Sequence, residues 1–196
     1  MLKRLYFFKW SLLLTLMLSM VVLLAGCPKA FQGKEAALPP GITVGDTYYT
    51  QFSLMFEKNR HRTTNYRRGF LLPINAKVQL VSFGRKGFVI KVLPSGPEIQ
   101  IENVQKHTGD TPEQAFHKIL AKTPVNMKKF TRLERKNIMV GKVTKGMRKE
   151  AVIAAIGYPP ITGTPSLDMD EWRYWASRYD TFIVRFKNGK VVAVIN

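Results

Sequence analysis

The residue with the most distinctive chemistry in this sequence is Cys27, the only cysteine among 196 residues. A thiol can form a disulfide, bind a metal or carry a covalent modification. A single cysteine excludes a disulfide within the chain, and a free thiol in an oxidising compartment would be a liability. The residues directly before it, Leu24, Ala25 and Gly26, are small or apolar. This pattern favours a cysteine that is covalently modified.

The residues before Cys27 have the composition of an export signal. Three cations and no acidic residue flank or precede an apolar run from Trp10 to Leu24, which is shorter than the ~20 residues of a spanning helix. The run 23–27, Leu-Leu-Ala-Gly-Cys, resembles the lipobox of bacterial lipoproteins. It predicts a signal peptide at 1–26 and acyl chains such as palmitate on Cys27. The alternative is an ordinary signal peptide followed by a stray cysteine.

The residues after Cys27 favour one location. Pro28 and Lys29 follow it, and no aspartate of the kind that retains lipoproteins in the inner membrane stands there. We therefore expect a protein anchored in the cell outer membrane and facing the periplasm.

The mature chain is strongly basic, with 28 basic against 13 acidic residues after position 26. Basic patches can neutralise phosphates, but export makes nucleic acid an unsuitable partner and favours anionic phospholipid. Cations concentrate in 57–69 and in 128–149, where Glu134 is the one acid. The alternative is a solvated basic surface. The cations expected to contact anionic lipid are Arg60, Arg62, Arg67, Arg68, Lys128 and Lys129.

Residues that could support catalysis or hold a metal are scattered. His61, His107 and His117 stand in three segments without metal-binding spacing, and no nucleophile elbow or phosphate-binding loop is present. The acidic residues at 168, 170 and 171 lack the glycine and distal glutamate of a calcium loop, so a solvated loop is expected there. We expect no catalytic residue, no metal and no cofactor. An enzyme remains the minor alternative.

The N-terminal part of the mature chain is expected to be β-rich. Residues 27–43 contain three prolines and two glycines and predict a lipidated tether. Alternation predicts a strand over 48–56, followed by a basic loop over 57–69. Further strands are expected at 78–83, 88–93 and 98–104, joined by short turns as in a meander whose last strand has one wet face. The domain at 44–108 is therefore predicted to be a small open barrel, with an SH3-like barrel as the preferred form.

Helices are expected after this domain. In the connector 109–130, Thr111, Pro112 and Gln114 predict a capped helix over 112–122. Further helices are expected near 131–139 and over 148–156, the second ended by Gly157. Three strands follow at 172–177, 181–187 and 190–195. Asn188-Gly189 predicts a type I′ turn between the last two. The segment 131–196 therefore predicts two helices and a three-stranded sheet.

This C-terminal domain, 131–196, resembles the BamE (SmpA/OmlA) family of outer-membrane lipoproteins. The resemblance is carried by Gly146-Met147, Val152, the run 156–159, Trp172-Arg173-Tyr174 and the run 186–191. It implies two helices packed on a three-stranded antiparallel sheet and a non-enzymatic role beside the machinery that inserts β-barrel proteins. The residues with implied structural roles are Gly146, Gly157, Trp172, Tyr174, Asn188 and Gly189. Arg148 stands where the family commonly has a threonine that caps the helix.

These observations predict an α+β, lipid-anchored envelope protein that supports outer-membrane protein assembly or outer-membrane integrity. The β-barrel insertion machinery and anionic phospholipid are the expected partners. The alternative is a peptidoglycan-binding or protein-inhibitor type module on the same anchor. Fold resemblance implies binding more securely than it implies one partner.

Overall fold

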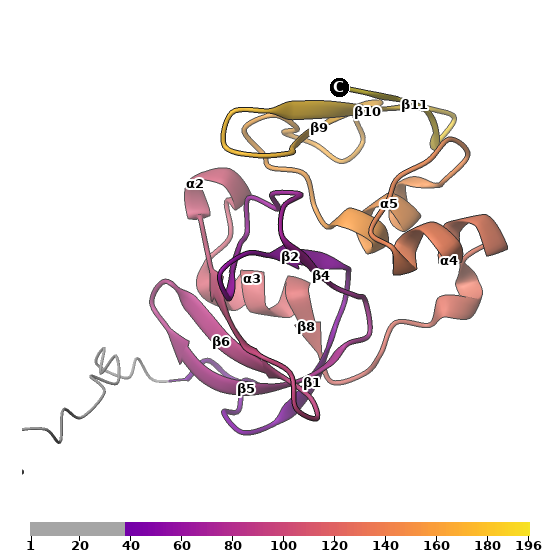
Figure 1. Ribbon diagram of the computed structural model, residues 1–196. Coiled ribbons are helices and arrows are strands. Elements are labelled where there is room, and N and C mark those ends of the chain that lie inside the picture. The colour runs from indigo at the N-terminus through magenta and orange to yellow at the C-terminus, as the bar shows by residue number, and fades with distance from the viewer. Residues whose placement is uncertain (1–37) are drawn as a thin grey trace, which may run out of the picture. The chain divides into compact units, whose positions relative to one another are not determined.

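The computed structural model describes residues 38–196, which form a mixed α+β fold (Figure 1). The predicted signal peptide, Cys27 and most of the predicted tether lie outside these described residues. Among the described residues, no helix is long and apolar enough to cross a membrane.

The largest sheet has six strands in the order β3-β7-β6-β5-β1-β8. Its centre is the predicted meander: β5 (Lys77–Gly84), β6 (Gly87–Val92) and β7 (Glu98–Glu102) are antiparallel neighbours. Ile99 and Ile101 are buried while Glu98 and Gln100 are exposed, which confirms the predicted wet face of the last strand. At the edges lie β8 (Leu120–Ala121), antiparallel to β1 (Thr47–Thr50), and β3 (Arg60–Arg62), parallel to β7.

The predicted strand over 48–56 is wrong in one respect, because it is two strands separated by a bend. After β1, the chain turns at residues 51–53 and continues as β2 (Leu54–Phe56), which pairs with β4 (Phe70–Leu72) in a separate sheet. The bend is held from outside the strand. The backbone N–H of Gln51 donates to the carbonyl of Ile119, and that of Ser53 donates to the carbonyl of Ala154.

The predicted basic loop over 57–69 is also wrong in part, because it contains β3. Pairing with β7 draws this strand into the sheet, so that His61 is only 1% exposed between exposed Arg60 and Arg62. The residues that follow, Thr63, Thr64 and Asn65, are buried as well. Four residues of this segment, at 61 and 63–65, are therefore interior.

Helix α3 (Pro112–Ile119) begins as predicted, with Thr111 and Gln114 forming a capping box. It ends three residues earlier than expected because the chain becomes extended to pair Leu120 with Thr50 of β1. Two short elements flank it, α2 (Gln105–Thr108) and the 3₁₀ turn η2 (Met127–Lys129). The core under the large sheet contains Tyr48, Leu54, Leu80, Ile101 and Phe116.

The C-terminal elements follow the predicted order. Helices α4 (Arg132–Met139) and α5 (Lys149–Ile156) precede an antiparallel sheet in the order β11-β10-β9, formed by β9 (Glu171–Trp175), β10 (Thr181–Lys187) and β11 (Lys190–Ile195). These elements enclose a second hydrophobic core, in which Trp172 and Tyr174 are fully buried.

Four predicted turn positions in this part, Gly146, Gly157, Asn188 and Gly189, have positive φ. Asn188 (φ 51°) and Gly189 (φ 71°) both take the left-handed conformation that a type I′ turn requires, which confirms the hairpin. Gly157 ends α5 with φ 78°, and a Cβ there would lie 2.6 Å from the amide nitrogen of Asn65. Gly157 is thus required both for its backbone conformation and for the close approach of Asn65.

Specific hydrogen bonds join the N-terminal strands to the C-terminal helices. The Ser53 hydroxyl donates to the carbonyl of Ile138 at 2.9 Å and accepts from the backbone N–H of Ile74 at 2.9 Å. The Asn65 amide donates to the carbonyl of Tyr158 at 2.8 Å, and the Arg67 guanidinium donates to that of Gly141 at 2.8 Å. Ile74 itself packs in the second core. The two cores therefore meet at a polar contact.

Candidate functional site

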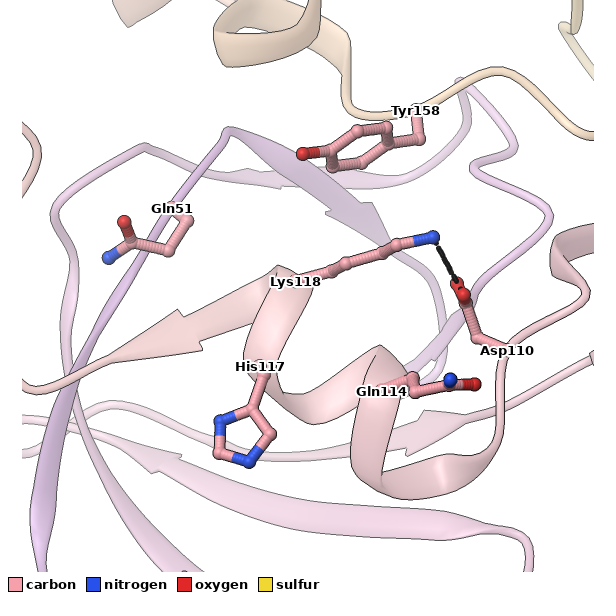
Figure 2. Close-up of a pocket in the computed structure, with 6 residues that line it drawn as sticks. All are labelled: Gln51, Asp110, Gln114, His117, Lys118 and Tyr158. Atoms are coloured by element: carbon pink, nitrogen blue, oxygen red, sulfur yellow. Dashed lines mark hydrogen bonds and ion pairs between the residues drawn. The ribbon is translucent and has the colours of Figure 1, made fainter. Parts of the chain in front are cut away.

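An open hollow of about 470 Å³ lies beside α3 (Figure 2). The side chains that line it are Gln51, Asp110, Gln114, His117, Lys118 and Tyr158. Asp110 lies just before α3 and Lys118 in its last turn, whereas Tyr158 directly follows the glycine that ends α5. The hollow thus combines residues from both halves of the described chain.

An ion pair forms one side of the hollow. The Lys118 ammonium lies 2.7 Å from both carboxylate oxygens of Asp110 and 5.2 Å from the centre of the Tyr158 ring (Figure 2). The Lys118 side chain is 40% exposed, while that of Asp110 is 14% exposed. The lysine is therefore the more accessible partner.

A smaller cavity of about 30 Å³ adjoins the hollow and shares Asp110, Lys118 and Tyr158 with it. Two of its lining residues, His61 and Asn65, are 1% and 4% exposed. His61 Nδ1 lies 2.7 Å from the carbonyl oxygen of Met55. Burial lowers the pKa of His61 to about 4, so the ring is neutral near pH 7, and its proton must sit on Nδ1 to donate to that carbonyl.

The two buried side chains each have an acceptor atom without a partner among residues 38–196. These atoms are Nε2 of His61 and Oδ1 of Asn65. The Asn65 amide nitrogen is already engaged by the carbonyl of Tyr158, and its backbone has φ 56°. Two of the residues that line the small cavity thus carry a buried acceptor atom without a partner in the described part of the chain.

Sequence reasoning did not find this site. It placed His61 in a basic loop and considered His117 only as an isolated histidine. The one available signal was Thr63-Thr64-Asn65, an uncharged polar stretch inside a basic segment. The three histidines do not converge, and no group of three or more His, Cys, Asp or Glu side chains in the described part of the chain could hold a metal.

The acidic residues near 168–171 are exposed, as expected, but their loop is arranged around a lysine of the same chain. The Lys149 ammonium donates to the carbonyls of residues 167, 168 and 169 at 3.1, 2.9 and 2.8 Å. It also lies 5.5 Å from the centre of the Trp172 ring. These carbonyls are therefore occupied by a side chain.

Five of the six cations expected to contact lipid lie at the surface, and four of them are paired. Arg60 and Arg62 both pair with Glu102, Arg68 pairs with Glu57, and Lys129 pairs with Glu150. Lys128 is exposed.

Arg67 corrects the expectation of six surface cations, because its guanidinium is turned into the protein. It donates to the Gly141 carbonyl, and burial lowers the pKa of Arg67 to about 10. The guanidinium is therefore not available to a membrane.

Helix α4 presents a different basic surface. Arg132, Arg135 and Lys136 are exposed. Three apolar residues of the same helix and its C-terminal end are exposed with them: Leu133 (45%), Met139 (50%) and Val140 (52%). This surface combines cations with apolar side chains.

Glu134, the acidic residue of α4, does not reduce this charge at the surface. It is 1% exposed and accepts hydrogen bonds from Arg148 Nε and Nη2 and from the backbone N–H groups of Thr131 and Arg148. The Arg148 guanidinium, helped by these backbone donors, lowers the pKa of Glu134 to about 2. Arg148 thus stabilises the start of α5 through Glu134 and not through a side-chain cap.

Comparisons of this chain with protein-family models, with characterised proteins and with solved structures found no match. The function is therefore inferred from the chemistry of the sequence and the geometry of the described residues.

Proposed function

We propose that this chain is a lipid-anchored, non-enzymatic protein of the bacterial outer membrane that supports outer-membrane protein assembly or outer-membrane integrity. The observation that carries the proposal is the run Leu-Leu-Ala-Gly-Cys at 23–27, which directly follows an apolar segment and ends at the only cysteine. Several acyl chains on one cysteine make membrane attachment effectively stable without a spanning helix.

The C-terminal elements support a BamE-like arrangement. Two helices precede a three-stranded antiparallel meander, and the last two strands are joined by a turn with positive φ at Asn188 and Gly189. The N-terminal strands support an SH3-like barrel, because β8 returns after α3 to pair with β1, the first strand of the sheet. Each such arrangement can carry many unrelated functions, so it supports a binding role without specifying one partner.

The surface of α4 supports a contact with anionic phospholipid. Basic side chains near an anionic bilayer each contribute about 1 kcal/mol, and apolar side chains between them can enter the interface. Arg132 and Lys136 are exposed on α4 together with the apolar side chains of Leu133 and Val140. We infer that α4 contributes more to lipid contact than the paired arginines of β3.

Affinity purification from detergent-solubilised envelopes tests the assembly role. The full chain with a C-terminal tag should retain components of the β-barrel insertion machinery, and the tagged Cys27→Ser chain should retain less. The proposal would be contradicted if both chains recovered only unrelated lipoproteins, in comparable amounts. Metabolic labelling with a clickable fatty acid checks the anchor separately, because only the chain with Cys27 should be labelled.

A peptidoglycan-binding module on the same anchor is the second candidate, and the hollow beside α3 favours it. Amide, carboxylate, ammonium and phenol groups lie together there in an open site of about 470 Å³. Recovery of murein fragments in place of membrane proteins in the same purification would support this candidate.

A further inference from the structure

The small cavity that adjoins the hollow is lined by two residues with hydrogen-bond acceptors that are unpartnered within residues 38–196. Nε2 of His61 and Oδ1 of Asn65 accept but cannot donate, and neither has a partner among the described residues. Thr63 and Thr108, which also line it, direct their hydroxyls toward Asn103 at 3.2 and 3.4 Å. A buried acceptor without a donor destabilises the folded protein. The cavity therefore favours a guest that donates.

The size of the cavity limits the guest. A volume of about 30 Å³ holds one polar group of the size of a water molecule. Two of the residues that line it carry the unpartnered acceptors, so a single guest atom that serves both must carry two hydrogens. A nitrogen with two N–H bonds meets this requirement.

A hydrogen-bond donor, the Lys118 ammonium, lies at the mouth of the cavity. The Lys118 ammonium has three hydrogens, and the two Asp110 oxygens at 2.7 Å account for two of them. The third can be donated to an acceptor on the guest. Because Lys118 is already present and the described residues contain 26 basic against 12 acidic side chains, a second cation is disfavoured. A neutral group with an N–H₂ end and an oxygen fits best.

We propose that the hollow and its inner cavity form a binding site for a ligand that ends in a primary carboxamide. The amide nitrogen donates to His61 and Asn65, its oxygen accepts from Lys118, and the rest of the ligand lies in the open hollow between α3 and Tyr158. This site goes beyond the proposed envelope function and does not depend on it.

Acetamide is the probe for this proposal, and the imidazole nitrogens of the ¹⁵N-labelled mature chain, residues 27–196 with Cys27→Ser, report its binding. Both cores lie within residues 42–191, so this chain retains them. We expect a saturable upfield shift of His61 Nε2, with His107 as the internal reference. N,N-dimethylacetamide, which has no N–H, should leave Nε2 unchanged. Methylammonium chloride at matched ionic strength should bind more weakly than acetamide.

Two variants localise the effect. Lys118→Met removes the donor at the mouth and should weaken acetamide binding about tenfold, as expected for one hydrogen bond to a charged group. Ala115→Val fills the cavity wall from α3 and should abolish the shift while the other imidazole signals keep their positions.

Three results would overturn the proposal. The first is equal shifts with acetamide and its dimethyl derivative. The second is tighter binding of methylammonium. The third is no shift at any concentration that leaves the protein folded, which would mean that the cavity holds an ordered water only.

Discussion

Two segments of this chain look alike in composition and differ in structure. Both 57–69 and 128–149 are rich in cations with one acidic residue each. In the first, the acid Glu57 is exposed and the cation Arg67 is turned inward beside buried His61 and Asn65. In the second, the acid Glu134 is buried and the cations of α4 are exposed.

The difference shows that charge density does not determine which charges face solvent. The hydrogen-bond partners that the fold places beside each charge determine whether that charge is buried. Arg67 is drawn inward by the carbonyl of Gly141, and Glu134 by the N–H of Thr131 and by Arg148. Each segment thus has one buried charge, and each gives a prediction.

The largest expected effect is at Glu134. Glu134→Ala removes the acceptor of Arg148 and of the capping N–H of Thr131. Removing one member of a buried ion pair costs roughly 3–5 kcal/mol, and the partial exposure of Arg148 favours the lower end. Urea unfolding measures it. Glu150→Ala, which removes the exposed partner of Lys129, is the control and should cost under about 1 kcal/mol. Equal costs would mean that Glu134 is solvated.

The second prediction concerns pH and His61. Its pKa is lowered from 6.5 to about 4 because the ring is buried, so the unfolded chain takes up a proton before the folded chain does. Stability is therefore full above pH 6.5 and falls as pH drops from 6.5 to 4, by about 3 kcal/mol in total.

Urea unfolding between pH 8 and pH 4 checks this dependence on the native chain and on His61→Gln, which should be flatter in that window. The pKa of Glu134, lowered from 4.5 to about 2, acts separately. Its contribution is present above pH 4.5 and is lost as pH falls toward 2. A native profile as flat as that of His61→Gln would show that His61 is accessible to solvent.

The third prediction compares adjacent arginines. Arg67→Ala leaves the carbonyl of Gly141 without its charged donor and should destabilise the fold by roughly 2 kcal/mol. Arg68→Ala removes only an exposed pair with Glu57 and should change stability by less than about 1 kcal/mol. Chemical denaturation of both variants decides between these values. If the order were reversed, the inward position of Arg67 would be wrong.

The smallest effect on stability is expected on α4, where function should change instead. Replacing Arg132 and Lys136 with glutamine should alter the free energy of unfolding by about 0.5 kcal/mol or less, since both are exposed. Binding to phosphatidylglycerol vesicles should weaken about thirtyfold, because each cation contributes about 1 kcal/mol.

Co-sedimentation with phosphatidylglycerol and phosphatidylcholine vesicles at low and high salt measures this binding. The matched control is Arg60→Gln with Arg62→Gln, whose cations are paired with Glu102. A larger loss in the control than in the α4 variant would assign the lipid contact to β3.

The elements that the sequence predicted well are those with local causes. The alternation of Ile99 and Ile101 with polar residues places β7, the Thr111–Gln114 capping box starts α3, and Asn188-Gly189 forms the last hairpin. In each case the interacting residues lie within a few positions of one another. Such patterns can be read without knowledge of the rest of the fold.

The segment between β1 and β5 could not be predicted because its partners are distant. The acceptor of the Ser53 hydroxyl is 85 residues away, and that of the Asn65 amide is 93 residues away. The bend after β1, the inward turn of Arg67 and the acceptor-lined cavity all depend on these contacts. The site therefore follows from tertiary structure, and neither spacing nor composition indicates it.

The buried Ser53 hydroxyl has a consequence for the order of events during folding. Its partners, Ile74 and Ile138, lie on either side of the meander and α3 in the chain. A nascent chain that has not yet presented residue 138 leaves this hydroxyl without its acceptor, and one that stops before residue 158 leaves Asn65 unbound as well. Contacts of such long separation slow folding. The bend after β1 and the contact of Asn65 are thus completed only after residues 138 and 158 have been made, and a truncated product should be recognisable to proteases by this open end.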